Sequence, residues 1–259
     1  MNNTALITGA SGGIGYELAY IHAKQGGNLV LVARSKNKLD QLKNDLENKY
    51  NINAYVIEKD LALRDSAKEV YEELVKNNIK VDYLINNAGF GDFGFFNDGN
   101  WEKLERMINL NITSLTQLTK LFLKDMIKSG SGKIMNVSST AAFQPGPLMA
   151  VYYATKAYVL SFSEAINDEL KNTGVTVTTL CPGATKSGFQ EVALLHESRL
   201  IKGRKLPSSK EVAQYGYNAM LKGKSVAIHG TFNYLLANSI RFAPRSLVVK
   251  VARFIQDKR

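Results

Sequence analysis

The chain has 259 residues, a length that suits one α/β domain, and its 45% hydrophobic residues can form a sizeable core, which argues against disorder. Its only cysteine, Cys181, excludes an intrachain disulfide and a cysteine metal cluster. The net charge of +10 arises in the C-terminal part, since residues 199–259 hold 13 of the 33 Lys and Arg but two of the 23 acidic residues.

Short apolar runs alternate with amphipathic stretches along the chain. The apolar runs predict strands at 5–8, 29–33, 54–57, 81–86, 133–138, 175–180 and 225–229. The amphipathic stretches predict helices at 13–26, 36–50, 64–77, 100–128, 150–173 and 208–222. This alternation predicts a single-domain α/β fold, in which a doubly wound parallel sheet of about seven strands has helices on both faces.

A glycine-rich turn, Thr8–Gly15, follows the first predicted strand and opens the first predicted helix. Glycines allow a tight turn and a close approach to a pyrophosphate, and the helix amino terminus attracts such an anion. The spacing Gly-x-x-x-Gly-x-Gly differs from the usual dinucleotide fingerprint, so a turn that merely connects strand to helix is the alternative. The residues expected to contact the phosphates are Gly9, Ser11, Gly13, Ile14 and Gly15.

The second predicted strand ends at Arg34. A carboxylate at this position would hold the ribose hydroxyl of NAD, whereas an arginine accommodates the 2′-phosphate of NADP. Arg34 suits a phosphate, and Lys38, a turn further on, adds positive charge. The sequence therefore predicts NADP(H), with a solvated surface arginine as the alternative.

Tyr152 and Lys156 stand four residues apart at the start of a predicted helix, so their side chains share one face. A nearby ammonium favours the phenolate and is expected to lower the pKa of the phenol from ~10, which makes it a usable proton donor. Taken alone, this spacing also fits a surface pair. A mixed stretch at 187–207 follows the sixth predicted strand and is predicted to cover the substrate, with an ordinary surface excursion as the alternative.

Six ordered motifs over residues 4–190 resemble those of the short-chain dehydrogenase/reductase family, in its single-domain branch. They are Thr8-Gly9-x-x-x-Gly13-x-Gly15, Asp60-Leu61, Asn86-Asn87-Ala88-Gly89, Asn111, Ser139 with Tyr152-x-x-x-Lys156, and Pro182-Gly183-x-Thr185. The resemblance implies a Rossmann-like catalytic domain over residues 1–230, followed by a basic extension of the same domain at 231–259.

The resemblance also implies roles for the residues of these motifs. Tyr152 would exchange a proton with the substrate oxygen, and Ser139 would hydrogen-bond that oxygen. Lys156 would lower the pKa of the tyrosine and hold the nicotinamide ribose, while Asn111 would hold a water that links the lysine to solvent. The residues implied to bind the cofactor elsewhere are Asp60, Leu61, Asn87, Ala88, Gly89, Tyr152, Lys156, Pro182, Gly183 and Thr185.

We therefore expect an NADP(H)-dependent carbonyl reductase that interconverts a carbonyl and an alcohol by hydride transfer. Apolar residues around the predicted crevice favour a hydrophobic ketone, although they would serve equally well as core packing. These residues are Phe90, Phe93, Phe95, Phe96, Phe143 and Leu148. A 3-oxoacyl thioester reductase with the same chemistry is one alternative, and a non-catalytic NADP-binding scaffold or sensor is another.

No basic segment followed by a long apolar stretch opens the sequence, and no run reaches the ~20 apolar residues that a membrane span needs, so a cytoplasmic location is expected. His22, His196 and His229 lack metal-ligand spacing, so no metal site is expected. Nucleic acid is not an expected partner, because no helix-turn-helix or zinc pattern accompanies the positive charge.

The extension continues for about thirty residues past the last predicted strand, where many members of the family end. It weakens the expectation of a tetramer and leaves a homodimer or a monomer. After Pro244 an amphipathic helical pattern places apolar residues on one face, namely Leu247, Val248, Val251, Phe254 and Ile255. Peripheral contact with an anionic membrane is one interpretation, and packing on the same domain or on a partner subunit is the other.

Overall fold

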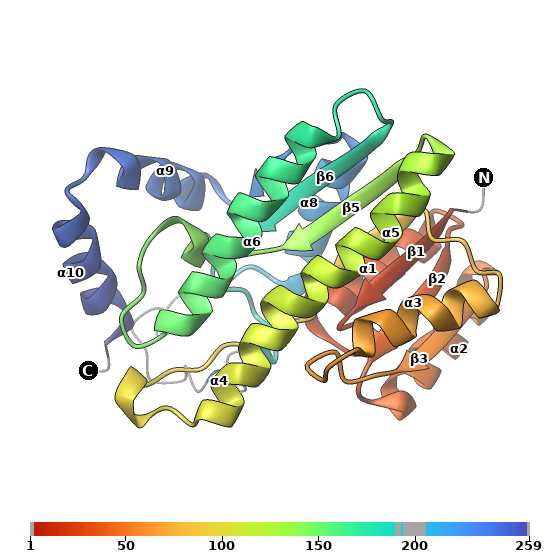
Figure 1. Ribbon diagram of the computed structural model, residues 1–259, viewed down its shortest axis with the longest axis horizontal. Helices are drawn as coiled ribbons and strands as arrows, with labels where there is room; N and C mark the ends of the chain where they lie inside the picture. Colours follow the sequence, from red (N-terminus) through yellow and green to blue (C-terminus); the bar gives the residue numbers. More distant parts are fainter. Residues whose placement is uncertain (1–2, 190–192, 194–205, 258–259) are drawn as a thin grey trace.

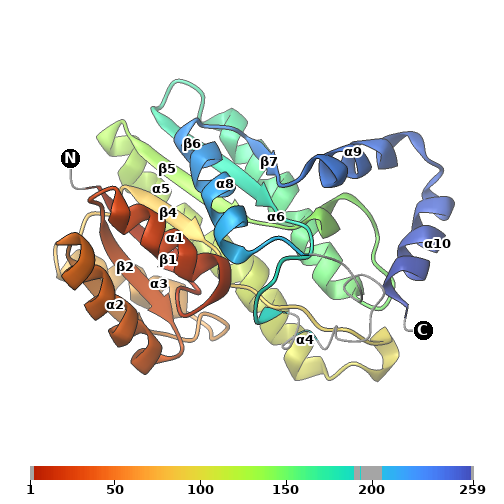
Figure 2. The same ribbon diagram turned by 180° about the vertical axis from the view of Figure 1, so that it is seen from behind.

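The computed structural model describes residues 3–189, 193 and 206–257. Within these residues one parallel sheet contains β1 (Thr4–Thr8), β2 (Asn28–Ala33), β3 (Ala54–Glu58), β4 (Tyr83–Asn86), β5 (Gly132–Val137), β6 (Val175–Cys181) and β7 (Val226–Ile228). Their order across the sheet is β3-β2-β1-β4-β5-β6-β7 (Figures 1 and 2). The chain thus extends the sheet first to one side of β1 and then to the other, which confirms the expected doubly wound fold.

Helices cover both faces of the sheet (Figures 1 and 2). One layer contains α1 (Gly13–Lys24), α2 (Lys36–Tyr50) and α8 (Ser209–Leu221), and the other contains α3 (Ser66–Lys76), α5 (Leu115–Ser129) and α6 (Ala150–Glu169). Leu6 and Ile7 of β1 show how the sequence produces this arrangement. Both side chains are fully buried, and because successive strand residues point to opposite faces, each joins the core under a different layer.

The remaining described helices lie beyond the sheet. They are α4 (Trp101–Ile108), α9 (Thr231–Ser239) and α10 (Arg245–Gln256), with short 3-10 turns η1 (Phe96–Asp98), η3 (Thr140–Phe143) and η4 (Ile240–Phe242). In Figures 1 and 2, α9 and α10 form the end of the molecule that is remote from α2 and β3.

The helix expected over 100–128 is present, but its geometry changes midway. It begins after Asn100, whose side chain accepts a 3.0 Å hydrogen bond from the Lys103 amide. Between α4 and α5 the chain makes a π-helical turn, η2 (Asn109–Ser114), and such turns occur frequently at functional sites. The turn contains Asn111, whose side chain is 1% exposed. The apolar periodicity of the sequence does not distinguish this turn from regular helix.

The carboxyl ends of β1 and β4 are joined by hydrogen bonds. Thr8 Oγ1 accepts from the backbone N–H groups of Asn87 and Ala88 at 3.0 and 2.9 Å, and Asn87 Nδ2 donates to the Thr8 carbonyl at 2.9 Å. Helix α1 packs directly on this junction. A Cβ on Gly15 would lie 2.5 Å from Asn87 Nδ2 and 2.5 Å from the Gly9 carbonyl oxygen, so only glycine allows this approach.

Gly15→Ala is expected to lower the melting temperature by several degrees, because overpacking costs about 1–3 kcal/mol. This cost exceeds the ~1 kcal/mol that alanine gains over glycine in a helix. Gly12→Ala is the matched control, since Gly12 has an extended backbone (φ 179°) and a Cβ there would meet no atom within 4 Å. Thermal unfolding followed by circular dichroism compares the two, and equal melting temperatures would contradict the packing argument.

Candidate active site

The predicted site residues gather at one edge of the sheet. Parallel strands have their carboxyl ends at the same edge, so segments far apart in sequence meet there. These segments are Gly9 after β1, Arg34 after β2, Asp60 after β3, Asn87–Gly89 after β4, Ser139 after β5 and Pro182–Thr185 after β6. The strand order reverses between β1 and β4, and doubly wound sheets bind their ligands at such a point.

The glycine turn presents an open helix end at this edge. Gly9 and Gly13 have φ values of +68° and +57°, in the left-handed region that favours glycine. Gly12 caps α1 without a side-chain hydrogen bond, and the first turn of the helix carries no acidic residue. Ser11 and Ile14 are partly exposed in the same turn. The N–H groups and dipole of this helix end therefore fit a dinucleotide phosphate.

Tyr152 and Lys156 lie beside the segment that follows β4, where a Cβ on Gly91 or Gly89 would approach them to 3.2 and 3.4 Å, and Ser139 lies next to Tyr152. Tyr152 and Lys156 occupy consecutive turns of α6, and the Lys156 ammonium lies 5.8 Å from the centre of the Tyr152 ring. Lys156 Nζ donates a 2.9 Å hydrogen bond to the carbonyl of Val137 at the end of β5. The Ser139 hydroxyl lies close enough to the Tyr152 hydroxyl to affect its pKa, and it donates a 3.4 Å hydrogen bond to the Pro182 carbonyl. Ser138 lies on the other side of the strand, where its hydroxyl donates to the Lys156 carbonyl at 2.8 Å.

Asn111 connects the π turn to this group. Its Nδ2 donates to the Phe90 carbonyl at 3.0 Å and to Thr155 Oγ1 at 3.1 Å, and its Oδ1 accepts from the Phe90 amide at 3.2 Å. A Cβ on Gly89 would lie 3.0 Å from Asn111 Oδ1 and 3.4 Å from Lys156 Nζ. The amide of Asn111 and the ammonium of Lys156 are therefore neighbours, and the missing side chain at position 89 leaves room between them.

Burial sets the protonation of the two titratable groups. It raises the pKa of Tyr152 to about 12, an effect that the neighbouring Ser139 hydroxyl partly opposes, and it lowers the pKa of Lys156 to about 8. The expectation that Lys156 lowers the pKa of Tyr152 is wrong for this structure, because the ammonium points at the Val137 carbonyl and desolvation dominates. At neutral pH the tyrosine is a protonated phenol and the lysine is charged.

The cofactor residues expected beside β2 and β3 form a charged group. Arg34 is exposed after β2, and Lys38 is exposed in the first turn of α2. Asp60 pairs with Arg106 of α4 at 2.5 Å. Burial opposes ionisation of Asp60, but the Ala62 amide, Arg106 and the charge of Arg34 hold its pKa below the ordinary value.

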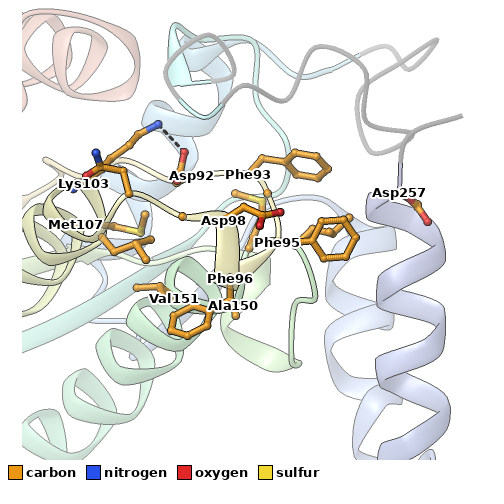
Figure 3. A pocket seen from close by; sticks show the side chains of 16 residues that line it. Asp92, Phe93, Phe95, Phe96, Asp98, Lys103, Met107, Ala150, Val151 and Asp257 are labelled. Carbon is orange, nitrogen blue, oxygen red and sulfur yellow. Dashed lines mark hydrogen bonds and ion pairs between the residues drawn. The ribbon is translucent and has the colours of Figure 1, made fainter.

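A pocket of about 560 Å³ opens between α4, the segment 92–100 and the start of α6 (Figure 3). Met149 and Val151 of its wall precede Tyr152 in the chain and pack with it in one apolar cluster, so the pocket adjoins the catalytic group. Of the apolar residues expected around the crevice, Phe93, Phe95, Phe96 and Leu148 line the pocket. Phe90 and Phe143 do not line it, because Phe90 packs near Tyr152 and Phe143 packs in a separate cluster with Cys181. Asp92 and Lys103 form a 2.5 Å ion pair in its wall.

The predicted substrate loop 187–207 lies largely outside the described residues, which include 187–189, 193, 206 and 207 of it. Within the described part, the rings of Phe189 and Tyr152 lie 5.4 Å apart. Thr185 is buried, and Pro182 precedes it at the end of β6.

Two residues of the site were not predicted from the sequence. Arg106 pairs with Asp60, and Thr155 accepts a hydrogen bond from Asn111. Thr155 lies inside the Tyr-x-x-x-Lys motif, one position before Lys156, which is the signal that could have drawn attention to it. No pattern in the sequence connects Arg106 to Asp60, because 46 residues separate them and only the fold brings them together.

Comparison with known proteins supports this geometry. A sequence model of the family described as short chain dehydrogenase matches residues 3–197. The very-long-chain 3-oxoacyl-CoA reductase of Mus musculus is 32% identical over 182 residues, which are 69% of this chain and 58% of that protein. An oxidoreductase of Staphylococcus epidermidis is 31% identical over 187 residues, 72% of this chain and 80% of its own length. The chain therefore spans little more than half the length of the mouse reductase.

Two solved structures share the fold closely. A short-chain dehydrogenase from Sphingobium yanoikuyae in complex with NADPH has a TM-score of 0.82 and 31% identity, with 93% of this chain and 94% of the other covered. A bulky-bulky ketone specific alcohol dehydrogenase from Comamonas testosteroni has a TM-score of 0.79 and 31% identity, with 93% and 92% covered. By its sequence, its sheet and the matched segment that includes Tyr152 and Lys156, the chain belongs to the short-chain dehydrogenase/reductase family of oxidoreductases, which use a nicotinamide cofactor.

Proposed function

We propose that the protein interconverts a hydrophobic ketone and its alcohol with NADP(H), and that Asn111, Ser139, Tyr152 and Lys156 form the catalytic centre. The observation that carries this proposal is that the interacting hydroxyls of Tyr152 and Ser139 lie next to the buried ammonium of Lys156. A protein that only bound the cofactor would have no need of two hydroxyl groups at this place, which argues against a non-catalytic scaffold or sensor.

When bound, the nicotinamide would supply the hydride. Tyr152 is proposed to donate its proton to the carbonyl oxygen of the substrate, and its raised pKa keeps that proton available at neutral pH. Ser139 Oγ would donate a hydrogen bond to the same oxygen as negative charge develops there. The Lys156 ammonium is proposed to hold the nicotinamide ribose. Asn111 is proposed to orient a water beside Lys156. This water would link Lys156 to solvent, so that a proton can return to Tyr152 after each turnover.

Arg34 is the basis for the choice of NADP(H) over NAD(H). It occupies the strand end where NAD-binding proteins of this fold place a carboxylate, and its guanidinium suits a 2′-phosphate. The neighbouring carboxylate of Asp60 forms its ion pair with Arg106 and not with Arg34, so the Arg34 guanidinium can contact a ligand phosphate. Lys38 would add to this charge. The NADPH bound in the Sphingobium structure supports the same choice.

The other cofactor contacts follow the order of the strands. The phosphates are proposed to bind at the glycine turn, the adenine beside β3, and the nicotinamide between β4 and β6. The residues proposed for these contacts are Gly9, Ser11, Gly13, Ile14, Gly15, Asp60, Leu61, Asn87, Ala88, Gly89, Pro182, Gly183 and Thr185.

The substrate is proposed to be apolar next to its reacting carbonyl. Aromatic and aliphatic side chains dominate the pocket beside Tyr152, and burial of such a substrate contributes about 25 cal/mol per Å² of apolar surface. The name of the Comamonas enzyme points to a bulky ketone, and that of the mouse protein points to a 3-oxoacyl thioester. Both substrates undergo the same chemistry, so the thioester is the second candidate, and NADPH consumption over a panel of the two classes separates them.

Tyr152→Phe removes the proposed acid and is expected to lower kcat about 10²- to 10⁴-fold while NADPH still binds. Tyr158→Phe is the control, because Tyr158 lies on the same helix but is exposed and hydrogen-bonded to Thr116. NADPH absorbance gives turnover, and fluorescence titration gives cofactor affinity. Turnover that survives in Tyr152→Phe would refute the assigned chemistry.

Arg34→Ala is expected to raise KM for NADPH roughly 10- to 100-fold, since a charge-assisted contact contributes about 1.5–3 kcal/mol. KM for NADH should change little. Lys24→Ala removes an equal charge at the far end of α1 and serves as the control. Steady-state kinetics with both cofactors measure the difference, and a similar loss with NADH and NADPH would argue against a 2′-phosphate contact.

The pH dependence of reduction should report on Lys156. Its pKa of about 8 means that the ammonium is present below pH 8 and is lost above it, while Tyr152 stays protonated. We expect kcat/KM for reduction to fall as the pH rises through about 8. In Lys156→Arg the guanidinium stays charged, so the fall should disappear even if the absolute rate is lower. An unchanged profile in that variant would assign the titration to another group.

A further inference from the structure

The C-terminal extension exposes an unusual number of large apolar side chains. Of the 17 large hydrophobic residues exposed within the described part of the chain, nine lie between residues 232 and 254. They are Phe232, Tyr234, Leu235, Leu236, Phe242, Leu247, Val249, Val251 and Phe254, which we call the C-terminal patch. Phe242 is 90% exposed, Phe232 71% and Phe254 66%. Exposed apolar surface on this scale marks an interaction site.

Helix α10 packs on its own domain, but through a different stripe from the apolar face seen in the sequence. Val248, Ala252 and Gln256, four residues apart, are its buried residues. Gln256 is 1% exposed and lies next to the side chain of Tyr153, so the end of the helix packs on α6. Packing within the chain therefore leaves the larger residues Leu247, Val251 and Phe254 facing outward.

The charge around the C-terminal patch has one sign. Between Glu211 and Asp257 the sequence contains no acidic residue. Arg241, Arg245 and Lys250 are exposed in this segment, and no ion pair joins any of them to another described residue. A second copy docking on the same patch would bring two segments rich in cations together, and their repulsion opposes a symmetric dimer through this face. A nucleic acid would match the charge but would leave the apolar side chains without a partner.

The C-terminal patch is continuous with the mouth of the substrate pocket. The guanidinium of Arg253 lies 5.0 Å from the centre of the Phe95 ring. Phe95 and Phe96 are exposed and line the pocket, and Asp257 at the end of α10 lines it too (Figure 3). A surface that bound α10 would therefore lie next to the mouth of this pocket.

We infer that α9, η4 and α10 dock on the surface of an anionic lipid bilayer, with the C-terminal patch in the headgroup region and the flanking cations on the lipid charges. Apolar side chains edged by arginine and lysine are the combination that such a surface binds. No helix in the described part of the chain combines the length and apolar character of a membrane span, and α10 has 12 residues, so the contact is peripheral. The inference stands apart from the proposed catalytic function.

Co-sedimentation of the full chain with vesicles tests the inference. We expect binding to vesicles of phosphatidylglycerol and phosphatidylcholine in equal parts, little binding to phosphatidylcholine alone, and weakening by salt. The combined variant Phe232→Ser, Leu235→Ser and Phe242→Ser should bind at least tenfold more weakly. The combined variant Arg241→Gln, Arg245→Gln and Lys250→Gln should lose on the order of fivefold in affinity for each cation removed.

Matched controls make equal changes elsewhere on the surface. Val75→Ser, Ile127→Ser and Leu221→Ser remove exposed apolar residues from α3, α5 and α8, and Lys120→Gln, Lys124→Gln and Lys128→Gln remove exposed charge from α5. Both control sets should bind vesicles like the unmodified chain. Failure of the unmodified chain to bind the anionic vesicles would overturn the inference, as would equal binding by the patch variants. Conversion of a dimer into a monomer by the apolar patch variant, seen by analytical ultracentrifugation, would assign the patch to a second copy and also overturn it.

Discussion

The junction between the ends of β1 and β4 is the contact on which the rest of the site depends. Thr8 and Asn87 join the two strand ends by hydrogen bonds, and Gly9 and Gly15 allow α1 to approach them closely. This contact fixes where the glycine turn lies relative to the segment that follows β4. The open end of α1 and residues 87–89 therefore face the same crevice, as ligand binding at a reversal of strand order requires.

Burial has opposite effects on the two titratable groups at this crevice. It holds the proton on Tyr152 and loosens the proton on Lys156, because both side chains are removed from water. The ammonium is compensated by the Val137 carbonyl rather than by a carboxylate within the described residues, so it keeps its charge near neutral pH. The buried phenol keeps its proton until a substrate oxygen accepts it, and the neighbouring lysine, whose proton is held less tightly than usual, can help to restore that proton.

The C-terminal extension packs against two segments of the proposed site, one after β6 and one in α6. In its first helix, Asn233 packs against Gly183 after β6, where a Cβ would lie 2.6 Å from Asn233 Nδ2. In its last helix, Gln256 contacts Tyr153, the neighbour of Tyr152 in the chain. The helices that expose the C-terminal patch are thus packed against segments on either side of the proposed catalytic centre.

Spacing along single elements is enough to predict the alternation of strands and helices, the glycine turn, and the pairing of Tyr152 with Lys156. The folded chain was needed to find the π turn that carries Asn111, the partner of the Lys156 ammonium, the Asp60–Arg106 pair and the side on which α10 is buried. Each of these depends on what packs from a distant segment, and desolvation by those segments raised the pKa of Tyr152 against the local expectation. Periodicity shows that a helix has an apolar face, but the shape and polarity of its neighbours determine which residues are covered.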